Sequence, residues 1–279
     1  MKSILVPIEE TEFLESVLQT ALLTARAFDG YIEGLHLRPD FTGVIAAAGM
    51  GASVLVEDFQ RDDWDRIRVS HRRFDKFMSE HGVPLTSVRP ASGPWAIFRA
   101  EAPPGDAFLG QHARLFDVSV FAQPPGRAEP PRTASLETAL FESGRPILVA
   151  PPAAPTTMGK TVVIAWNAST ETARTLAFAR PFLERAERVV VITAEGAMVE
   201  GPSGNDVVQY LGRAGIVAQA RHVSSRRGPG ETILEEARNI GADLLIKGAY
   251  TQSRLRQMIF GGATSHILAM ATMPVLMAH

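Results

Sequence analysis

The chain repeats one pattern of apolar runs and helical stretches, and this repetition restricts the fold more than any other feature. The run Lys2 to Ile8 is matched by Lys160 to Trp166, 158 residues later. The run Arg145 to Ala150 is matched by Met273 to Ala278, 128 residues later. A proline-rich stretch, 151–155, separates the two copies, as expected of a linker. The sequence therefore predicts two tandem copies of one unit.

The first copy is longer than the second. Gly105 opens a helical stretch that matches the one opened by Gly230, and the offset there has fallen to 125 residues. The fall from 158 to 125 gives the first copy about 33 additional residues. We predict a first domain at 1–152 with a helical insertion at about 39–82, and a second domain at 159–279.

The insertion contains a long amphipathic stretch. From Ala52 to Glu80, apolar side chains recur at helical spacing among many charged ones, which predicts one long helix. Packing on its own domain is the default expectation for such a helix. The sequence leaves open that it covers the seam between the domains or presents a surface to a partner.

Each copy alternates short strands with helices, which is typical of an α/β fold with a parallel sheet. The runs are rich in β-branched residues and lack strict alternation, so the strands are expected to be buried on both faces. In the second half we expect strands near 161–166, 189–194, 216–223, 243–248 and 274–278. A helix is expected from Glu171 to Arg185, interrupted by Pro181. Ligands of such sheets bind beyond the carboxyl ends of the strands.

Composition excludes several classes of protein. The chain has no cysteine, which removes disulfides, thiol nucleophiles and cysteine-based metal sites. Its 28 basic and 30 acidic residues nearly cancel, which argues against general nucleic-acid binding. The seven histidines form no recognisable metal motif. With no signal-like or membrane-spanning segment, a cytoplasmic protein without membrane contact is expected.

The segment after the fourth strand of the second half carries the clearest functional signal. Gly248 ends the strand, and Gly261 and Gly262 open a helix from Ala263 to Met270. Glycine permits close approach of the backbone to an anion, and free N–H groups at a helix start bind phosphate. The hydroxyl of Thr264 is an additional donor. Such residues are found at phosphate sites and also in ordinary loops that precede a helix, so both interpretations stay open at this point.

This segment resembles the nucleotide loop of the universal stress protein family, which reads Gly, two residues, Gly, nine residues, Gly and then usually Ser. Gly248 and Gly261 match, whereas Thr251 replaces the second Gly and Gly262 replaces Ser. Trp166-Asn167-Ala168-Ser169 resembles the family's Val-Asp-Gly-Ser, with Asn167 in place of the Asp near the adenosine. The order of elements agrees over essentially the whole chain.

The resemblance implies two tandem Rossmann-like (adenine nucleotide alpha hydrolase-like) domains, each with a five-stranded parallel sheet. It implies that the closing strands of the domains pair, giving an intramolecular pseudo-dimer. It also implies an adenine nucleotide, ATP or AMP, with magnesium when ATP is bound, and no catalytic residue or protein metal ligand. The expected nucleotide-binding residues are Asn167, Gly248, Tyr250, Thr251, Gly261, Gly262, Ala263 and Thr264.

The corresponding loop of the first half lacks these features. Between Phe121 and the helix that starts near Thr133 it has four prolines and one glycine, so backbone donors for an anion are few. We expect no nucleotide there. The leading hypothesis is a non-catalytic stress-response protein that binds nucleotide in its second domain. The alternatives are a structural or adaptor protein with both sites lost, and a slow nucleotide hydrolase. A protein partner and a homodimer are left open.

Overall fold

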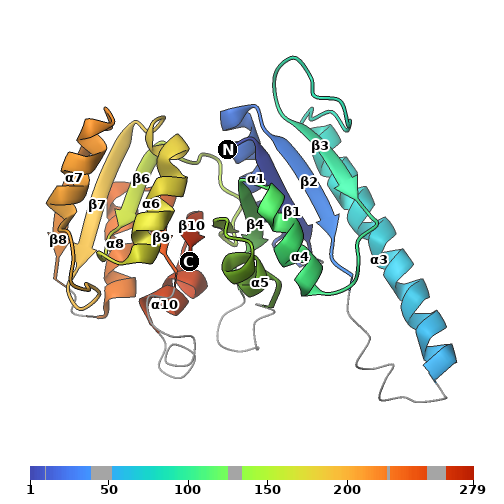
Figure 1. Cartoon of the computed structure of the whole chain (residues 1–279). Coiled ribbons are helices and arrows are strands. Elements are labelled where there is room, and N and C mark those ends of the chain that lie inside the picture. The colour runs from blue at the N-terminus through green and yellow to red at the C-terminus, as the bar shows by residue number, and fades with distance from the viewer. Residues whose placement is uncertain (10, 39–51, 125–133, 225–226, 250–261) are drawn as a thin grey trace.

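The strands of the protein form one ten-stranded sheet with helices on both of its faces (Figure 1). The computed structural model describes residues 1–9, 11–38, 52–124, 134–224, 227–249 and 262–279, with the backbone alone for 52–62. The strands are β1 (Ser3–Ile8), β2 (Tyr31–His36), β3 (Trp95–Arg99), β4 (Val118–Ala122), β5 (Ile147–Ala150), β6 (Thr161–Ala165), β7 (Arg188–Ala194), β8 (Ala218–Val223), β9 (Leu244–Gly248) and β10 (Val275–Ala278). The expected α/β fold class is confirmed.

The strand order is β3-β2-β1-β4-β5-β10-β9-β6-β7-β8. Neighbouring strands are parallel throughout, except that β5 and β10 are antiparallel. At this seam Leu276 faces Leu148, and the flanking residues pair in register. The expected meeting of the two closing strands is confirmed. The domain limits 1–152 and 159–279 stay a prediction, because one continuous sheet joins the two halves.

Two apolar cores cover the two faces of the sheet. The helices are α1 (Leu14–Phe28), α3 (Ala52–Glu80), α4 (Asp106–His112), α5 (Ala134–Glu142), α6 (Thr170–Leu183), α7 (Gly204–Arg213), α8 (Pro229–Ile240) and α10 (Ala263–Met270), with a short 3-10 turn, η2 (Ala113–Leu115). Helices α1, α3, α6 and α7 contribute to one core, and α4, α5, α8 and α10 to the other. Alternate strand residues face opposite cores, so the strands are buried on both sides.

The prediction that Pro181 interrupts the helix is wrong. Helix α6 continues through Pro181 and ends at Leu183. Proline lacks an N–H and disturbs the turn that precedes it, but here it stands two residues from the helix end, so the effect is confined to the last two turns.

The inserted helix α3 packs on its own half of the chain, which was the default expectation. It contacts β2, β3 and α1 and runs along the outer side of the first half (Figure 1). Its buried Phe74 lies against Gly34 of β2, where an added Cβ would stand 2.6 Å from the Phe74 ring. A side chain at residue 34 would therefore push the helix away. Within the described part of the chain, no helix is both long enough and apolar enough to cross a bilayer.

Helices α1 and α6 contact each other across the seam between the halves. The rings of Phe28 and Phe182 meet edge to face with their centroids 5.1 Å apart. The guanidinium of Arg185 lies 5.6 Å from the centroid of the Phe28 ring. The two halves thus share side-chain packing as well as backbone pairing.

A buried carboxylate joins β2, β3 and α4 in the first half. Glu33 accepts hydrogen bonds from Tyr31 Oη at 2.8 Å and Arg99 Nε at 2.8 Å, and its Oε1 lies 2.6 Å from His112 Nε2. Burial alone would raise the pKa of Glu33, but these hydrogen bonds outweigh burial and hold that pKa below its ordinary value. The same carboxylate and the burial of the phenol raise the pKa of Tyr31.

We predict that the halves are energetically coupled through Phe28 and Phe182. Each change to alanine should lower the free energy of unfolding by about 3–5 kcal/mol. The loss of unfolding free energy in the double variant should differ from the sum of the two single losses by about 0.5–1.5 kcal/mol, the usual range for an aromatic pair. Urea denaturation of the four proteins measures this coupling. Leu109→Ala, in the opposite core, serves as the control that should add to Phe182→Ala without coupling; a coupling of zero for the aromatic pair would contradict the prediction.

We predict that Glu33→Gln lowers the free energy of unfolding by about 2 kcal/mol at pH 7, because hydrogen bonds to a charged acceptor are replaced by weaker ones. Since the folded pKa of Glu33 is lowered, its contribution is complete above the ordinary glutamate value of 4.5 and is lost as the pH falls through the folded pKa. The difference between wild type and variant should therefore shrink on acidification below about pH 4.5. Denaturation at a series of pH values tests this, and a difference that grows toward low pH would refute it.

Candidate functional site

Two of the described site residues, Asn167 and Gly248, lie at the carboxyl ends of two adjacent strands in the second half. Strands β6 and β9 pair in parallel, with Ala165 opposite Lys247. The chain leaves β6 for α6, which covers one face, while α10, the helix that precedes β10, covers the other. Connections that diverge to opposite faces define the point at which open α/β sheets bind ligands.

Asn167 organises the turn between β6 and α6. Its Oδ1 accepts hydrogen bonds from the Ser169 amide at 3.2 Å and from Thr172 Oγ1 at 2.5 Å. Ser169 is the N-cap of α6 and accepts from the Thr172 amide. The side-chain oxygen of Asn167 thus holds the start of α6 against the end of β6.

Ala168, the next residue, has a φ of 66°, which is the left-handed conformation. This conformation is disfavoured for a residue with a Cβ. The resembled pattern has glycine here, and the structure gives the physical reason for it. The turn is therefore strained in this chain.

Gly248 allows the end of β9 to touch the start of α6. A Cβ added to Gly248 would lie 2.6 Å from Thr172 Oγ1, closer than any side chain tolerates. Because Asn167 bonds to the same hydroxyl, both predicted site residues meet at Thr172. The glycine is required by this close approach, whether or not a ligand binds.

The start of α10 has no side-chain cap among the residues that the structure describes. Gly262 is its N-cap residue with extended backbone, no side-chain hydrogen bond caps it, and the first turn contains no acidic residue. The N–H groups of a first helical turn have no partner within the helix. Ala263 and Thr264 begin this turn, and Thr264 is buried. The arrangement favours a bound anion over a cation.

Lys247 joins the strand end to the helix start, and the sequence reasoning did not identify it. Its Nζ donates to Gly248 O at 2.8 Å and to Thr264 Oγ1 at 2.7 Å. The residue is 7% exposed, and burial lowers the pKa of its amine to about 8. A lysine directly after the apolar run Leu244 to Ile246 and directly before the motif glycine was the signal that could have found it.

The loop between β7 and α7 lies against the Asn167 turn. The Val199 amide donates to the Asn167 carbonyl at 3.0 Å, and Trp166 Nε1 donates to Pro202 O at 2.7 Å. Val199 and its neighbour Met198 have partly exposed apolar side chains. This loop gives the site an apolar side next to its polar turn.

Three predicted site residues, Tyr250, Thr251 and Gly261, lie outside the described residues. The same holds for 125–133, most of the first-half loop. Thus the structure brings together Asn167, Gly248 and Thr264, through Thr172 and Lys247, and places Gly262 and Ala263 at the same helix start.

The first half differs at the position that corresponds to Gly248. Ala122 pairs with Ala150 of β5 just as Gly248 pairs with Ala278 of β10. A Cβ at this position is incompatible with the close approach that Gly248 makes. In the first half, the helix after the opening strand begins at Leu14, and its N-cap residue, Phe13, has no side-chain cap.

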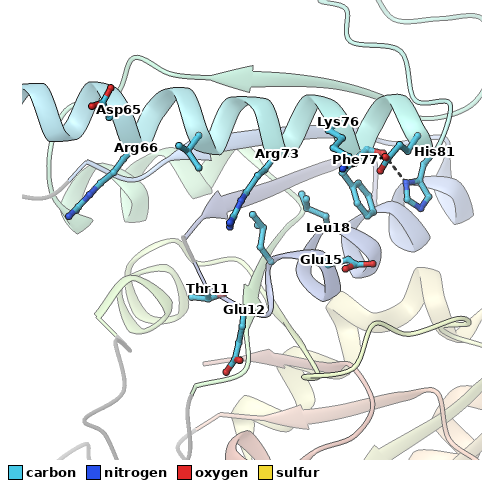
Figure 2. Close-up of a pocket in the computed structure, with 13 residues that line it drawn as sticks. Thr11, Glu12, Glu15, Leu18, Asp65, Arg66, Arg73, Lys76, Phe77 and His81 are labelled. Carbon is cyan, nitrogen blue, oxygen red and sulfur yellow. Dashed lines mark hydrogen bonds and ion pairs between the residues drawn. The ribbon is translucent and has the colours of Figure 1, made fainter.

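A groove of about 830 Å³ lies elsewhere, between α1 and α3 in the first half (Figure 2). Glu12 and Glu15 belong to its α1 side, whereas Arg66 and Arg73 belong to its α3 side. Charges of both signs line it, so it does not concentrate one charge as a phosphate site does. Among the described residues, no group of three or more His, Asp or Glu side chains could hold a metal ion.

Parts of the chain are similar in sequence to known stress proteins. Residues 205–279 match the model of the universal stress protein family. A 48-residue segment is 40% identical to the stress response protein NhaX of Bacillus subtilis. That match covers 17% of this chain and 29% of the length of NhaX.

Two solved structures share the fold over the whole chain. A universal stress protein from Archaeoglobus fulgidus superposes with a TM-score of 0.69 at 15% identity, covering 99% of this chain and 95% of that one. A functionally unknown protein from Pseudomonas aeruginosa gives a TM-score of 0.52 at 14% identity, covering 100% and 92%. At these identities the likeness establishes the fold.

We predict that Ala168→Gly stabilises the protein. Relief of the left-handed strain should exceed the entropy cost of glycine, raising the free energy of unfolding by about 0.5–1 kcal/mol. Thermal and urea denaturation measure the change. Ala173→Gly, within the regular part of α6, is the matched control and should destabilise by about 1 kcal/mol. A lower free energy of unfolding in Ala168→Gly would contradict the inference that the backbone at Ala168 is strained.

Proposed function

We propose that this chain is a member of the universal stress protein family and that its second half binds an adenine nucleotide, AMP or ATP, without catalysing its turnover. The observation that carries the proposal is the convergence of Asn167, Gly248 and the uncapped start of α10 at the ends of two neighbouring strands. The Asn167 turn gives the site a hydrogen-bonded polar side, and the start of α10 gives it N–H groups that can bind an anion.

The parts of the site suit different parts of the nucleotide. The Asn167 turn, with Met198 and Val199 beside it, supports contacts to the adenosine. The N–H groups of α10 and the hydroxyl of Thr264 support contacts to phosphate. Tyr250, Thr251 and Gly261 are proposed to complete the phosphate side.

Magnesium does not have a protein cage in the described part of this site. Magnesium is commonly held by one or two carboxylates together with substrate phosphates and water. Neither Asn167, Gly248, Gly262, Ala263 nor Thr264 supplies a carboxylate. Magnesium would thus arrive with ATP, bound to its phosphates.

We predict that AMP binding depends on the charge at the N-cap of α10. Gly262 has room for a side chain, since an added Cβ meets nothing within 4 Å, and its extended backbone suits any residue. Both Asp and Asn are good N-caps, so Gly262→Asp and Gly262→Asn should remain folded. The variants have the same shape and differ in charge. Gly262→Asp should bind AMP about tenfold or more weakly than Gly262→Asn, because its carboxylate repels the phosphate.

Isothermal titration with AMP, ATP and adenosine provides the measurement. Adenosine should bind the two variants equally, since it carries no phosphate. If wild type gives no heat with millimolar AMP or ATP, the nucleotide proposal fails and the adaptor hypothesis takes its place. Phosphate released from ATP by wild type above the level of Gly262→Asp would instead support a hydrolase.

A further inference from the structure

Lys247 is a buried cation for which no carboxylate partner is found among the described residues. Lysine is rarely buried unless paired, because removing an ammonium from water is costly. Its two acceptors, Gly248 O and Thr264 Oγ1, are both uncharged. Burial is the one cause that shifts its pKa, so no described charged group offsets the loss of water.

The elements around Lys247 explain this isolation. On the sheet it stands between Ala165 of β6 and Met277 of β10, both uncharged. The ionisable groups of the covering elements are Glu231, Glu235, Glu236 and Arg238 of α8, His266 of α10 and the terminal His279. None of these groups contributes to the pKa shift of Lys247. Glu171 belongs to α6, which covers the opposite face.

When the Lys247 amine is charged, one of its three N–H groups has no acceptor among the described residues. An ammonium has three N–H groups, whereas a neutral amine has two. The two acceptors found for Nζ satisfy the neutral form completely. In the charged form a third N–H remains, next to the helix start at Thr264. The positive end of the helix dipole there disfavours a cation unless an anion is also present.

We propose that Lys247 is the phosphate-recognising cation of this site, and that the nucleotide phosphate binds together with the proton that charges the Lys247 amine. This inference rests on the proposed function, since it assigns a role within the same site. The third N–H of the ammonium and the free N–H groups of α10 both donate to phosphate oxygens. The phosphate in turn supplies the negative charge that the buried ammonium lacks.

The proposal gives AMP binding a defined pH dependence. The pKa of Lys247 in the free protein is about 8, so the amine is mostly charged below that pH and mostly neutral above it. A bound phosphate favours the charged form and raises this pKa. AMP affinity should therefore fall roughly tenfold between pH 7.5 and 9, as the free amine loses its proton. Adenosine affinity should stay constant over the same range.

The first experiment uses the unaltered protein. Titrations of AMP at pH 8 in buffers of different ionisation enthalpy give the number of protons taken up. We expect uptake of about half a proton per AMP, since Lys247 is about half charged beforehand. The phosphate of AMP is already fully ionised at this pH, and arginine does not titrate there. Adenosine should take up none; an AMP uptake of zero overturns the proposal.

The second experiment compares Lys247→Met with Lys160→Met. Methionine keeps the length and apolar stem of the buried side chain. Lys160 stands at the other end of β6, is well exposed and pairs with Glu187, so its substitution is the matched control. Lys247→Met should weaken AMP about 10- to 100-fold at pH 7, the range for loss of a charged hydrogen bond. Lys247→Met should leave adenosine affinity unchanged and abolish the proton uptake on AMP binding. Lys160→Met should change neither the affinities nor the proton uptake.

The outcomes separate this inference from the proposed function. If wild type binds AMP and adenosine but Lys247→Met binds AMP as tightly, the role of Lys247 is refuted and nucleotide binding stands. If Lys247→Met loses AMP and adenosine equally, Lys247 maintains the shape of the site and the proposal is also refuted. If wild type binds neither ligand, the proposed function and this inference both fail.

Discussion

The antiparallel pairing of β5 with β10 is the constraint on which the rest of the molecule depends. Each half closes with four buried apolar residues, and either strand alone would present an unpaired edge to solvent. Their pairing converts two five-stranded sheets into one, and it brings α1 and α6 together so that Phe28 and Phe182 share one core. The same backbone contact thus determines which helices meet across the seam.

The candidate site is built on this rigid base. The ends of β6 and β9 are fixed by neighbours on both sides, so the Asn167 turn, Gly248 and Lys247 are held on well-packed strands. The strained Ala168 stands three residues after Ala165, the sheet partner of Lys247, whose amine has no carboxylate partner among the described residues. Such costs persist where the surrounding structure enforces them, and they gather where ligands bind.

Much of the fold could be predicted from the sequence because its signals are local and repeated. The limits of α3 at Ala52 and Glu80 were predicted because a long run of helical spacing has few alternatives. The effect of Pro181 was misjudged, because sequence does not show how near a helix end lies. The glycine pattern located Gly248 and the start of α10, but not Lys247, whose significance depends on what the fold places around its amine.

The ten residues between β5 and β6 join the halves covalently, and this has an evolutionary consequence. A linker of this length holds the second half at an effective concentration on the order of millimolar, and always in a ratio of one to one. In a dimer of identical chains, any change to one loop appears twice. Here each half can change alone: Ala122 takes the position of Gly248 while the shared seam is preserved. The covalent joint thus allows a substitution in one half to leave the other half unchanged.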